Sequence, residues 1–276
     1  MAIPQRNQRE RLLRHVKKKI DVSVGGLRPS AIAGRFHGPR VLINSIPKAG
    51  THLLEGILED LPLMRNGGKR TLVLTGQNQT AIERSVSGVR RGEFLTAHIG
   101  CNPWTSRCLQ NSQTRMLFMV RDPRDVVVSR YRYVAEIDHL HPAHAFMKAL
   151  PGNRDRLKAA ITGIAGKMPS MAETLDEFSG WLNHDSALTI RFEDIIGCRG
   201  GGDAAIQRRA IEQISEFVGL QVAPSEIDAT LSKSLGKTSS THRSGKIGSS
   251  IDEFDDEVEA LYQSSVAVFA ARYGYR

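Results

Sequence analysis

The sequence has few cysteines and no long hydrophobic run. Its 276 residues contain three cysteines, Cys101, Cys108 and Cys198, and no C-x-x-C pair. An odd number excludes a complete disulfide framework, so we expect three free thiols and a reducing compartment. No run of about 18 apolar residues could span a membrane, and the basic N-terminus lacks the apolar core of a signal peptide. These absences predict a cytoplasmic protein.

Acidic residues are scarce only at the N-terminal end. The net charge is +9, with ten basic and two acidic residues in 1–40 and 28 basic and 27 acidic residues in the remainder. We therefore predict a basic arm, 1–40, and a single domain, 41–276. Because the charge of the domain is balanced, we expect no nucleic-acid partner. The arm is interpreted as a solvated segment, and a weak contact with an anionic membrane surface is the alternative.

Five apolar runs are typical of buried parallel strands, and helical patterns lie between several of them. The runs cover 41–46, 71–75, 94–97, 116–120 and 187–192. This alternation predicts an α/β fold with a central parallel sheet flanked by helices. Residues 138–170 are predicted to form an excursion of short helices, and 252–271 a final helix.

The stretch SIPKAGTHLL places a lysine and a glycine in the turn between a predicted strand and a predicted helix. The N–H groups of Gly50, Thr51 and His52 would open that helix toward an anion, and Lys48 and the Thr51 hydroxyl would add a charge and a donor. The lysine precedes the glycine, so this is not the ATP-type loop G-x-x-x-x-G-K-[ST]. An ordinary turn with Thr51 as a cap is the alternative.

The stretch RDPRDVVVS supplies a second candidate anion site. Arg121 ends a predicted strand and Ser129 follows eight residues later, so a turn and a helix could bring both to one phosphate. The alternative is ordinary surface pairing, in which Asp122 or Asp125 neutralises Arg124. Because both turns open at the carboxyl ends of strands, the two sites would share one edge of the sheet.

In this order the two motifs resemble the 5′-phosphosulfate loop and the 3′-phosphate motif of the sulfotransferases that use 3′-phosphoadenosine 5′-phosphosulfate (PAPS). The family patterns P-K-[SA]-G-T and R-[DN]-P-[RK]-D-x-x-x-S are matched at 47–51 and 121–129. LTAHIG, IRFEDI and HRSGKIG resemble three further family segments, so the likeness extends over most of 41–254. It implies a P-loop-NTPase-like three-layer α/β/α fold and transfer of a sulfuryl group to an acceptor hydroxyl.

The resemblance implies a role for each matched residue. Around the 5′ end of the donor it places Lys48, Ala49, Gly50, Thr51 and His52, and around the 3′-phosphate Arg121, Ser129, Arg243, Ser244 and Gly245. Leu53 stands where many members have a tryptophan, and Ser244 where a lysine is usual. Stacking on adenine is therefore assigned to Phe192 or to another group.

The implied chemistry centres on His98 as the base that deprotonates the acceptor. Lys48 stabilises the departing phosphate, and Ser129 bonds the 3′-phosphate and Lys48. A histidine without a chemical role is the alternative for His98. The expected product is 3′,5′-adenosine bisphosphate (PAP), and no metal is implied, although His139, His141 and His144 form a short histidine cluster.

The acceptor and two competing functions stay open at the level of sequence. The acceptor is a small-molecule, sugar or lipid hydroxyl, and the oligomeric state is not predicted. The competing functions are a nucleotide-dependent kinase with a divergent phosphate loop, and a non-catalytic module that binds nucleotide or polyanion.

Overall fold

The computed structural model describes residues 29–68, 71–74, 78–234 and 246–275. Its strands are β1 (Arg40–Ser45), β2 (Arg65–Asn66), β3 (Leu72–Val73), β4 (Glu93–His98), β5 (Arg115–Val120) and β6 (Ala187–Arg191). Its helices are α2 (Pro29–His37), α3 (Thr51–Asp60), α4 (Gln79–Ser87), α5 (Pro103–Asn111), α6 (Pro123–Arg132), α7 (His144–Ala149), α8 (Asn153–Thr162), α9 (Met171–Ser179), α10 (Phe192–Ile195), α11 (Ala204–Val218), α12 (Pro224–Ser234), α13 (Asp256–Ser265) and α14 (Ala267–Arg272). A π-helical turn, η1 (Tyr133–Ile137), extends α6, and a 3-10 turn, η2 (Cys198–Gly200), follows α10.

The strands form one parallel sheet in the order β2-β4-β1-β5-β6, and β3 also pairs with β4. The central strand β1 lies between β4 and β5, with Asn44 opposite Ala97 and Ser45 opposite Met119. The carboxyl ends of these three strands therefore lie at the same edge. Open parallel sheets bind their ligands at this edge.

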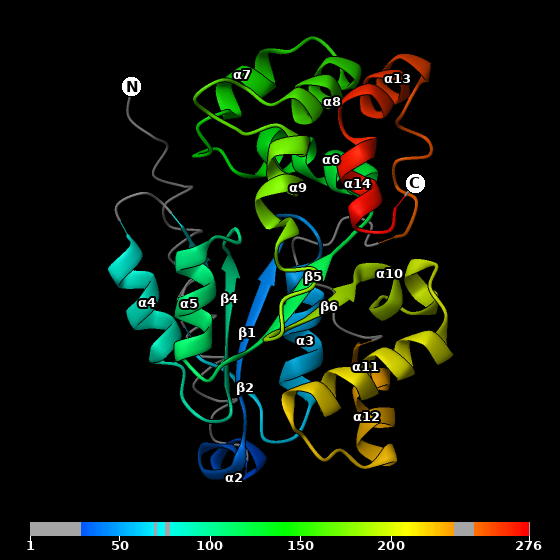
Figure 1. Cartoon of the computed structure of the whole chain (residues 1–276). Coiled ribbons are helices and arrows are strands. Elements are labelled where there is room, and N and C mark those ends of the chain that lie inside the picture. The colour runs from blue at the N-terminus through cyan, green and yellow to red at the C-terminus, as the bar shows by residue number, and fades with distance from the viewer. Residues whose placement is uncertain (1–28, 69–70, 75–77, 235–245, 276) are drawn as a thin grey trace.

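Helices flank the sheet, which confirms the predicted fold class. Because both faces are covered, strands such as β1 and β5 are buried at successive positions rather than at alternate ones. On one face Leu42 and Met116 lie beneath α4 and α5. Helix α3 buries Leu54, Ile57 and Leu58, packs on β1 and contacts α12. Figure 1 shows the sheet between these groups of helices.

A layer of helices lies above the carboxyl ends of the strands (Figure 1). It contains α6 to α9 together with α13 and α14, and the predicted excursion of short helices in 138–170 is confirmed by α7 and α8. The single final helix predicted for 252–271 is wrong, because Val266 interrupts it with φ −120° and ψ −32°. The break lets α13 pack on α8 and α14 pack on α9 while Val266 and Ala270 are both buried.

Strands β2 and β3 have two residues each, which is too short for a sequence pattern to predict. The strand predicted over 71–75 is reduced to Leu72–Val73, and the pair Arg65–Asn66 was not predicted because two polar residues form no apolar run. Both are held by pairing to β4, a long-range interaction that local periodicity does not contain.

Helix α2 packs on the body of the protein, although it lies within the residues assigned to the basic arm. Ala31 is buried, and a side chain at Gly34 would meet the carbonyl of Leu63. Ile32 and Phe36 are exposed on this helix. Most of the predicted arm, and with it the predicted membrane contact, lies outside the described residues.

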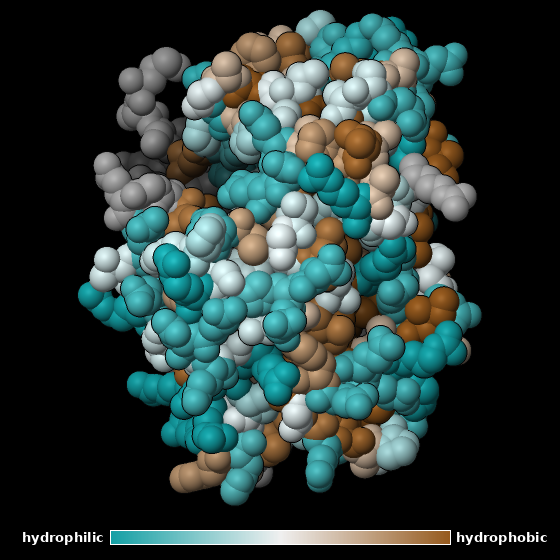
Figure 2. Space-filling model, in the orientation of Figure 1, coloured by the Kyte–Doolittle hydropathy of each residue, from teal (hydrophilic) through white to brown (hydrophobic). Residues whose placement is uncertain are grey.

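The described helices include none long and apolar enough to cross a membrane. Figure 2 shows a mainly hydrophilic surface over α4 and α5, with small hydrophobic patches elsewhere on the same face. All three cysteines are free thiols, and of these Cys198 is exposed.

Candidate functional site

The turn from β1 to α3 has the backbone geometry of an anion-binding loop. Lys48 and Gly50 both have positive φ, 77° and 104°. Gly50 is the N-cap of α3, and no side chain from the described residues caps this helix. The first-turn N–H groups therefore point out of the helix toward the sheet edge with the positive end of the helix dipole. A non-glycine residue with positive φ is strained, and such strain is common at functional sites.

Gly50 is required by packing as well as by its φ. A Cβ at this position would lie 2.6 Å from a ring carbon of Phe192 and 2.9 Å from Met119. Phe192 is 1% exposed, and its ring packs against the loop at Gly50. The guanidinium of Arg121 stacks over the same ring, with Cζ 4.2 Å from the ring centroid. The structure therefore gives Phe192 a supporting position between the two anion sites, not an open face on which a base could stack.

The Lys48 side chain lies at the site on the ring of Tyr133, with Nζ 3.7 Å from the ring centroid. Burial lowers the pKa of Lys48 to about 8; attraction to Asp138 raises this pKa, and repulsion from Arg121 lowers it. Ser129 lies on α6, one helical turn before Tyr133, and is half-buried. Lys48 therefore contacts the residue that follows α6, and Ser129 lies in the last two turns of that helix.

His98 is fixed at the end of β4 by the end of β1. Its Nδ1 lies 2.9 Å from the carbonyl oxygen of Ser45 and 3.1 Å from the Ser45 hydroxyl. A carbonyl only accepts, so Nδ1 carries the proton and Nε2 of the neutral ring keeps its lone pair. Burial lowers the pKa of His98, the bond to Ser45 opposes this, and the charges of Lys48 and His52 lower it further. The ring is therefore neutral near pH 7 and can accept a proton at Nε2.

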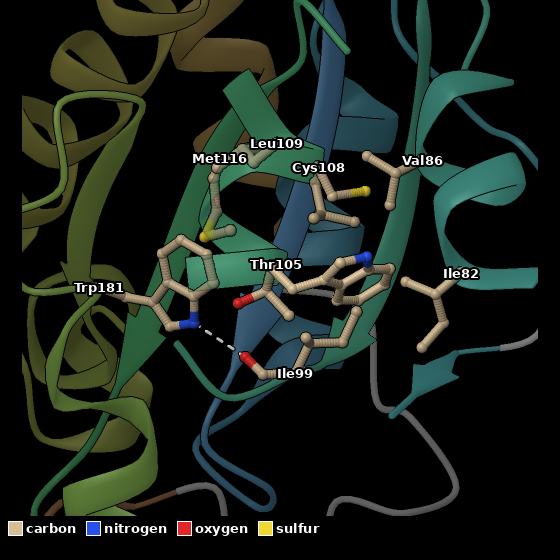
Figure 3. A pocket seen from close by; sticks show the side chains of 10 residues that line it. Ile82, Val86, Ile99, Thr105, Cys108, Leu109, Met116 and Trp181 are labelled. Atoms are coloured by element: carbon tan, nitrogen blue, oxygen red, sulfur yellow. Dashed lines mark hydrogen bonds between the residues drawn. The ribbon is translucent and has the colours of Figure 1, made fainter. Parts of the chain in front are cut away.

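The backbone beside His98 is held by side chains from two other elements. Asn44 on β1 donates to the Ile99 carbonyl (2.8 Å) and accepts from the Ile99 N–H (2.9 Å). The indole of Trp181 donates to the same carbonyl at 2.8 Å, as Figure 3 shows. These bonds fix the strand end that carries the histidine.

Thr51 and His52 are engaged within the loop. The Thr51 hydroxyl lies 2.7 Å from that of Ser45, which links the first turn of α3 to the residue that orients His98. His52 Nδ1 lies 2.5 Å from Glu55 in the next helical turn. Their backbone N–H groups open the helix as the sequence predicts.

Arg121 is buried at the end of β5, and its guanidinium has a defined orientation. One terminal nitrogen donates to Asp125 at 3.1 Å and to the carbonyl of Lys246 at 2.8 Å. Within the described part of the chain, its Nε has no hydrogen-bond partner. A buried guanidinium with an unused donor suits a second phosphate group.

Asp125 anchors the segment that follows the late sequence motif. Its fully buried carboxylate accepts bonds from the Gly248 N–H (3.0 Å), the Ser249 hydroxyl (3.0 Å) and the Ser250 N–H (2.9 Å), besides Arg121.

Glu259, through its hydrogen bond, and Asp122, through its charge, both raise the pKa of Arg124, so pairing around this residue is observed in part. Arg124 forms a two-point pair with Glu259 on α13, and Asp125 is buried beside Arg121 instead. Asp122 caps α6 by accepting from the Arg124 N–H at 2.9 Å. The carboxylates of this motif therefore organise the helix start and the late loop.

Three predicted residues, Arg243, Ser244 and Gly245, lie outside the described residues. Of the histidine cluster, His139 Nδ1 and His144 Nε2 lie 3.4 Å apart. Within the ranges that the structure describes, no group of three or more metal-ligating side chains could hold an ion.

Sequence reasoning missed three residues at the site, Ser45, Tyr133 and Asp138. Ser45 bonds His98, and the other two act on Lys48. Nothing in the local pattern shows which side chains face Lys48 or His98, because these contacts join different elements of the fold.

A small apolar cavity lies between the sheet and helices α4 and α5 (Figure 3). Its volume is about 20 Å³, and its lining includes Ile99, Trp104 and Trp181. The Thr105 hydroxyl there is already bonded to the Gly100 carbonyl. Such a space holds at most a single water, so it is a packing gap behind His98 and not an acceptor pocket.

The fold and site together define an α/β protein with two candidate anion-binding turns and a neutral histidine at one sheet edge. Residues 38–264 match the sulfotransferase domain family. The chain therefore belongs to that family. It is 23% identical over 141 residues to Sulfotransferase 2A2 of Rattus norvegicus, a match that covers 50% of this chain and 42% of the relative.

Solved sulfotransferase structures share the fold at low sequence identity. Mouse sulfotransferase SULT7A1 complexed with PAP superposes with a TM-score of 0.62 and 15% identity, covering 90% of this chain and 94% of that one. Retinol dehydratase in complex with androsterone and PAP gives a TM-score of 0.53 and 14% identity, covering 92% and 84%. These likenesses show that the chain shares the sulfotransferase fold.

Proposed function

We propose that this protein transfers the sulfuryl group of PAPS to an acceptor hydroxyl, with His98 as the base. The observation that carries the proposal is the order of the strands. The loop of β1 that holds Lys48 lies between His98 at the end of β4 and Arg121 at the end of β5. A donor with anionic groups at both ends of its ribose would meet Lys48 at one end and Arg121 at the other, with His98 beside the lysine.

The side chains present fit such a donor. Three features suit the 5′-phosphosulfate end of the donor: the uncapped N-terminus of α3, the strained backbone of Lys48, and the close backbone approach that Gly50 allows. The unused Nε of Arg121 and the half-buried Ser129 suit the 3′-phosphate. Arg243, Ser244 and Gly245 are proposed to complete this second site, as the family motif implies.

In the proposed reaction the acceptor oxygen forms a bond to sulfur while the bond from sulfur to the bridging phosphate oxygen breaks. His98 takes the acceptor proton on Nε2, which its Nδ1 bond to Ser45 leaves unprotonated. Lys48 places its ammonium at the bridging oxygen, where negative charge develops. The products are a sulfate ester, PAP and one proton on the histidine.

The acceptor is proposed to be a hydroxyl compound with an apolar part. Val73 pairs in register with His98 and is 50% exposed, and Leu140, two residues after Asp138, is 53% exposed. Retinol dehydratase has been solved with androsterone and with retinol, both apolar molecules that carry a hydroxyl. Apolar alcohols and phenols should therefore be better acceptors than free sugars.

The first test compares ligands by their effect on the melting temperature. PAP should raise it more than ATP with Mg²⁺ does, because only PAP offers a 3′-phosphate to Arg121. Equal or reversed shifts would favour the kinase. A screen of hydroxyl acceptors with labelled PAPS then separates an enzyme from a non-catalytic binding module. Arg121→Ala should weaken binding of PAP far more than binding of 5′-AMP.

A further inference from the structure

The turn that follows α6 presents two groups to Lys48 that no sequence motif marks. Tyr133 lies under the ammonium, at 3.7 Å from ring centroid to Nζ, and Asp138 is the carboxylate whose charge acts on it most strongly. Tyr133 begins the π-helical turn η1, and Asp138 closes it by donating its N–H to the Tyr133 carbonyl at 2.9 Å. One short turn therefore brings the Tyr133 ring into contact with the lysine, and the residue that closes it supplies a carboxylate that also accepts from the Leu140 N–H at 3.3 Å.

The wider geometry of η1 makes this arrangement possible. A π-helical turn inserts an extra residue into the helical repeat, and such turns are frequent at functional sites. The Val134 carbonyl, which the altered repeat exposes, is bonded by His144 Nδ1 at 2.7 Å. Val134 and Ala135 are buried, so the turn is packed into the helical layer and its conformation is fixed.

We propose that Tyr133 and Asp138 form a resting site for the Lys48 ammonium, from which the anionic donor draws the side chain. Both are then positioning residues for sulfuryl transfer, and this role rests on the function proposed above. The face of an aromatic ring is negative and attracts a cation that has lost part of its water, and a nearby carboxylate adds to this attraction. Lysine has a flexible stem, so its charge can leave the ring without movement of the loop backbone.

The resting site competes with the donor for one charge. Arg121 and His98 also surround Lys48; repulsion from Arg121 disfavours its charged form, while the ring and Asp138 favour it. Replacing the Tyr133 ring by an aliphatic side chain should therefore lower the pKa of Lys48 by roughly half to one unit. At pH 6.5, where the lysine stays charged, the same loss should tighten PAP binding roughly two- to fivefold, because less attraction must be given up.

The experiment titrates Lys48 directly in the protein without ligand. Tyr133→Leu, Tyr133→Phe and Asp138→Asn are compared with the unmodified chain by brief acetylation between pH 6.5 and 10. Mass spectrometry follows the peptide containing Lys48, with exposed Lys167 as an internal standard. Tyr133→Leu and Asp138→Asn should lower the titration midpoint, and Tyr133→Phe, which keeps the ring, should leave it unchanged.

Binding of PAP at pH 6.5 is then measured by calorimetry on the same variants. The resting site is supported if the Lys48 midpoint is lower in Tyr133→Leu and Asp138→Asn. PAP should also bind more tightly to Tyr133→Leu and equally well to Tyr133→Phe. A Lys48 midpoint that is the same in all four proteins overturns it, whatever their activity. Shifted midpoints in proteins that do not bind PAP would refute the proposed function and leave the resting site in place.

Discussion

Binding of PAP should take up protons at alkaline pH, because Lys48 is partly neutral before the ligand arrives. Burial lowers its pKa to about 8, so about half of the protein is deprotonated there at pH 8, about one tenth at pH 7 and about nine tenths at pH 9. A bound phosphate favours the ammonium and restores the ordinary pKa. The expected uptake is therefore about 0.1, 0.5 and 0.9 proton per PAP at these three pH values.

Isothermal titration in buffers of different ionisation enthalpy measures this number. At each pH the slope of observed enthalpy against buffer enthalpy gives the protons exchanged. Affinity should also fall about tenfold between pH 7 and pH 9, since the ligand must then bind the minor protonated form. Phosphate groups with a second pKa near 6 are about nine-tenths ionised at pH 7 and almost fully ionised at pH 8 and 9, so the two higher pH values carry the test.

Lys48→Arg is the control, because a guanidinium stays charged throughout the range. It should abolish the uptake at pH 8 and 9. Equal uptake by the variant and the unmodified protein would show that Lys48 is not the titrating group. Uptake that is largest near pH 6 and vanishes above pH 8 would assign the proton to His98, whose pKa is lowered by burial.

Three further outcomes follow from the site. His98→Asn should reduce transfer by roughly 10²–10⁴-fold while PAP binding is retained, and unchanged transfer would remove His98 as the base. For the unmodified enzyme, kcat/KM for PAPS should rise with pH as His98 loses its proton and fall above about 8 as Lys48 of the free enzyme loses its own. Gly50→Ala should weaken PAP binding roughly tenfold or more in calorimetry, because its Cβ would lie 2.6 Å from the Phe192 ring at a φ of 104°. Asp125→Asn, which breaks a fully buried charge pair, should cost roughly 3 kcal/mol and lower the melting temperature by about 6–12 °C. Exposed Asp185→Asn should change it little, and similar melting of the two variants would contradict the role of Asp125.

The longer strands and the two candidate anion-binding turns could be predicted because their determinants are local. A buried parallel strand is a continuous apolar run, and a phosphate loop needs a glycine and a cation at a strand end. The structure confirms the parallel sheet and brings Lys48, His98 and Arg121 to one edge. Their catalytic and binding roles remain predictions.

The remaining features depend on contacts between distant segments. The break at Val266 satisfies packing on two different helices, and β2 exists only because it pairs with β4. The sequence predicts adenine stacking on Phe192 or on another group, whereas the burial of Phe192 beneath Gly50 follows from the approach of α10 to the β1 loop. Nor does local spacing indicate that η1 would bring Tyr133 under Lys48.

The bonds that Asp125 makes also determine how this part of the protein opens. Gly248 and Ser250 donate to a carboxylate more than 120 residues earlier in the chain, and Glu253 and Glu259 pair with Arg132 and Arg124 on the same helix. Segments joined in this way open as one cooperative unit in hydrogen exchange. Slower exchange at the amides of Gly248 and Ser250 would therefore report stabilisation of Arg121, even though neither amide needs to touch a ligand.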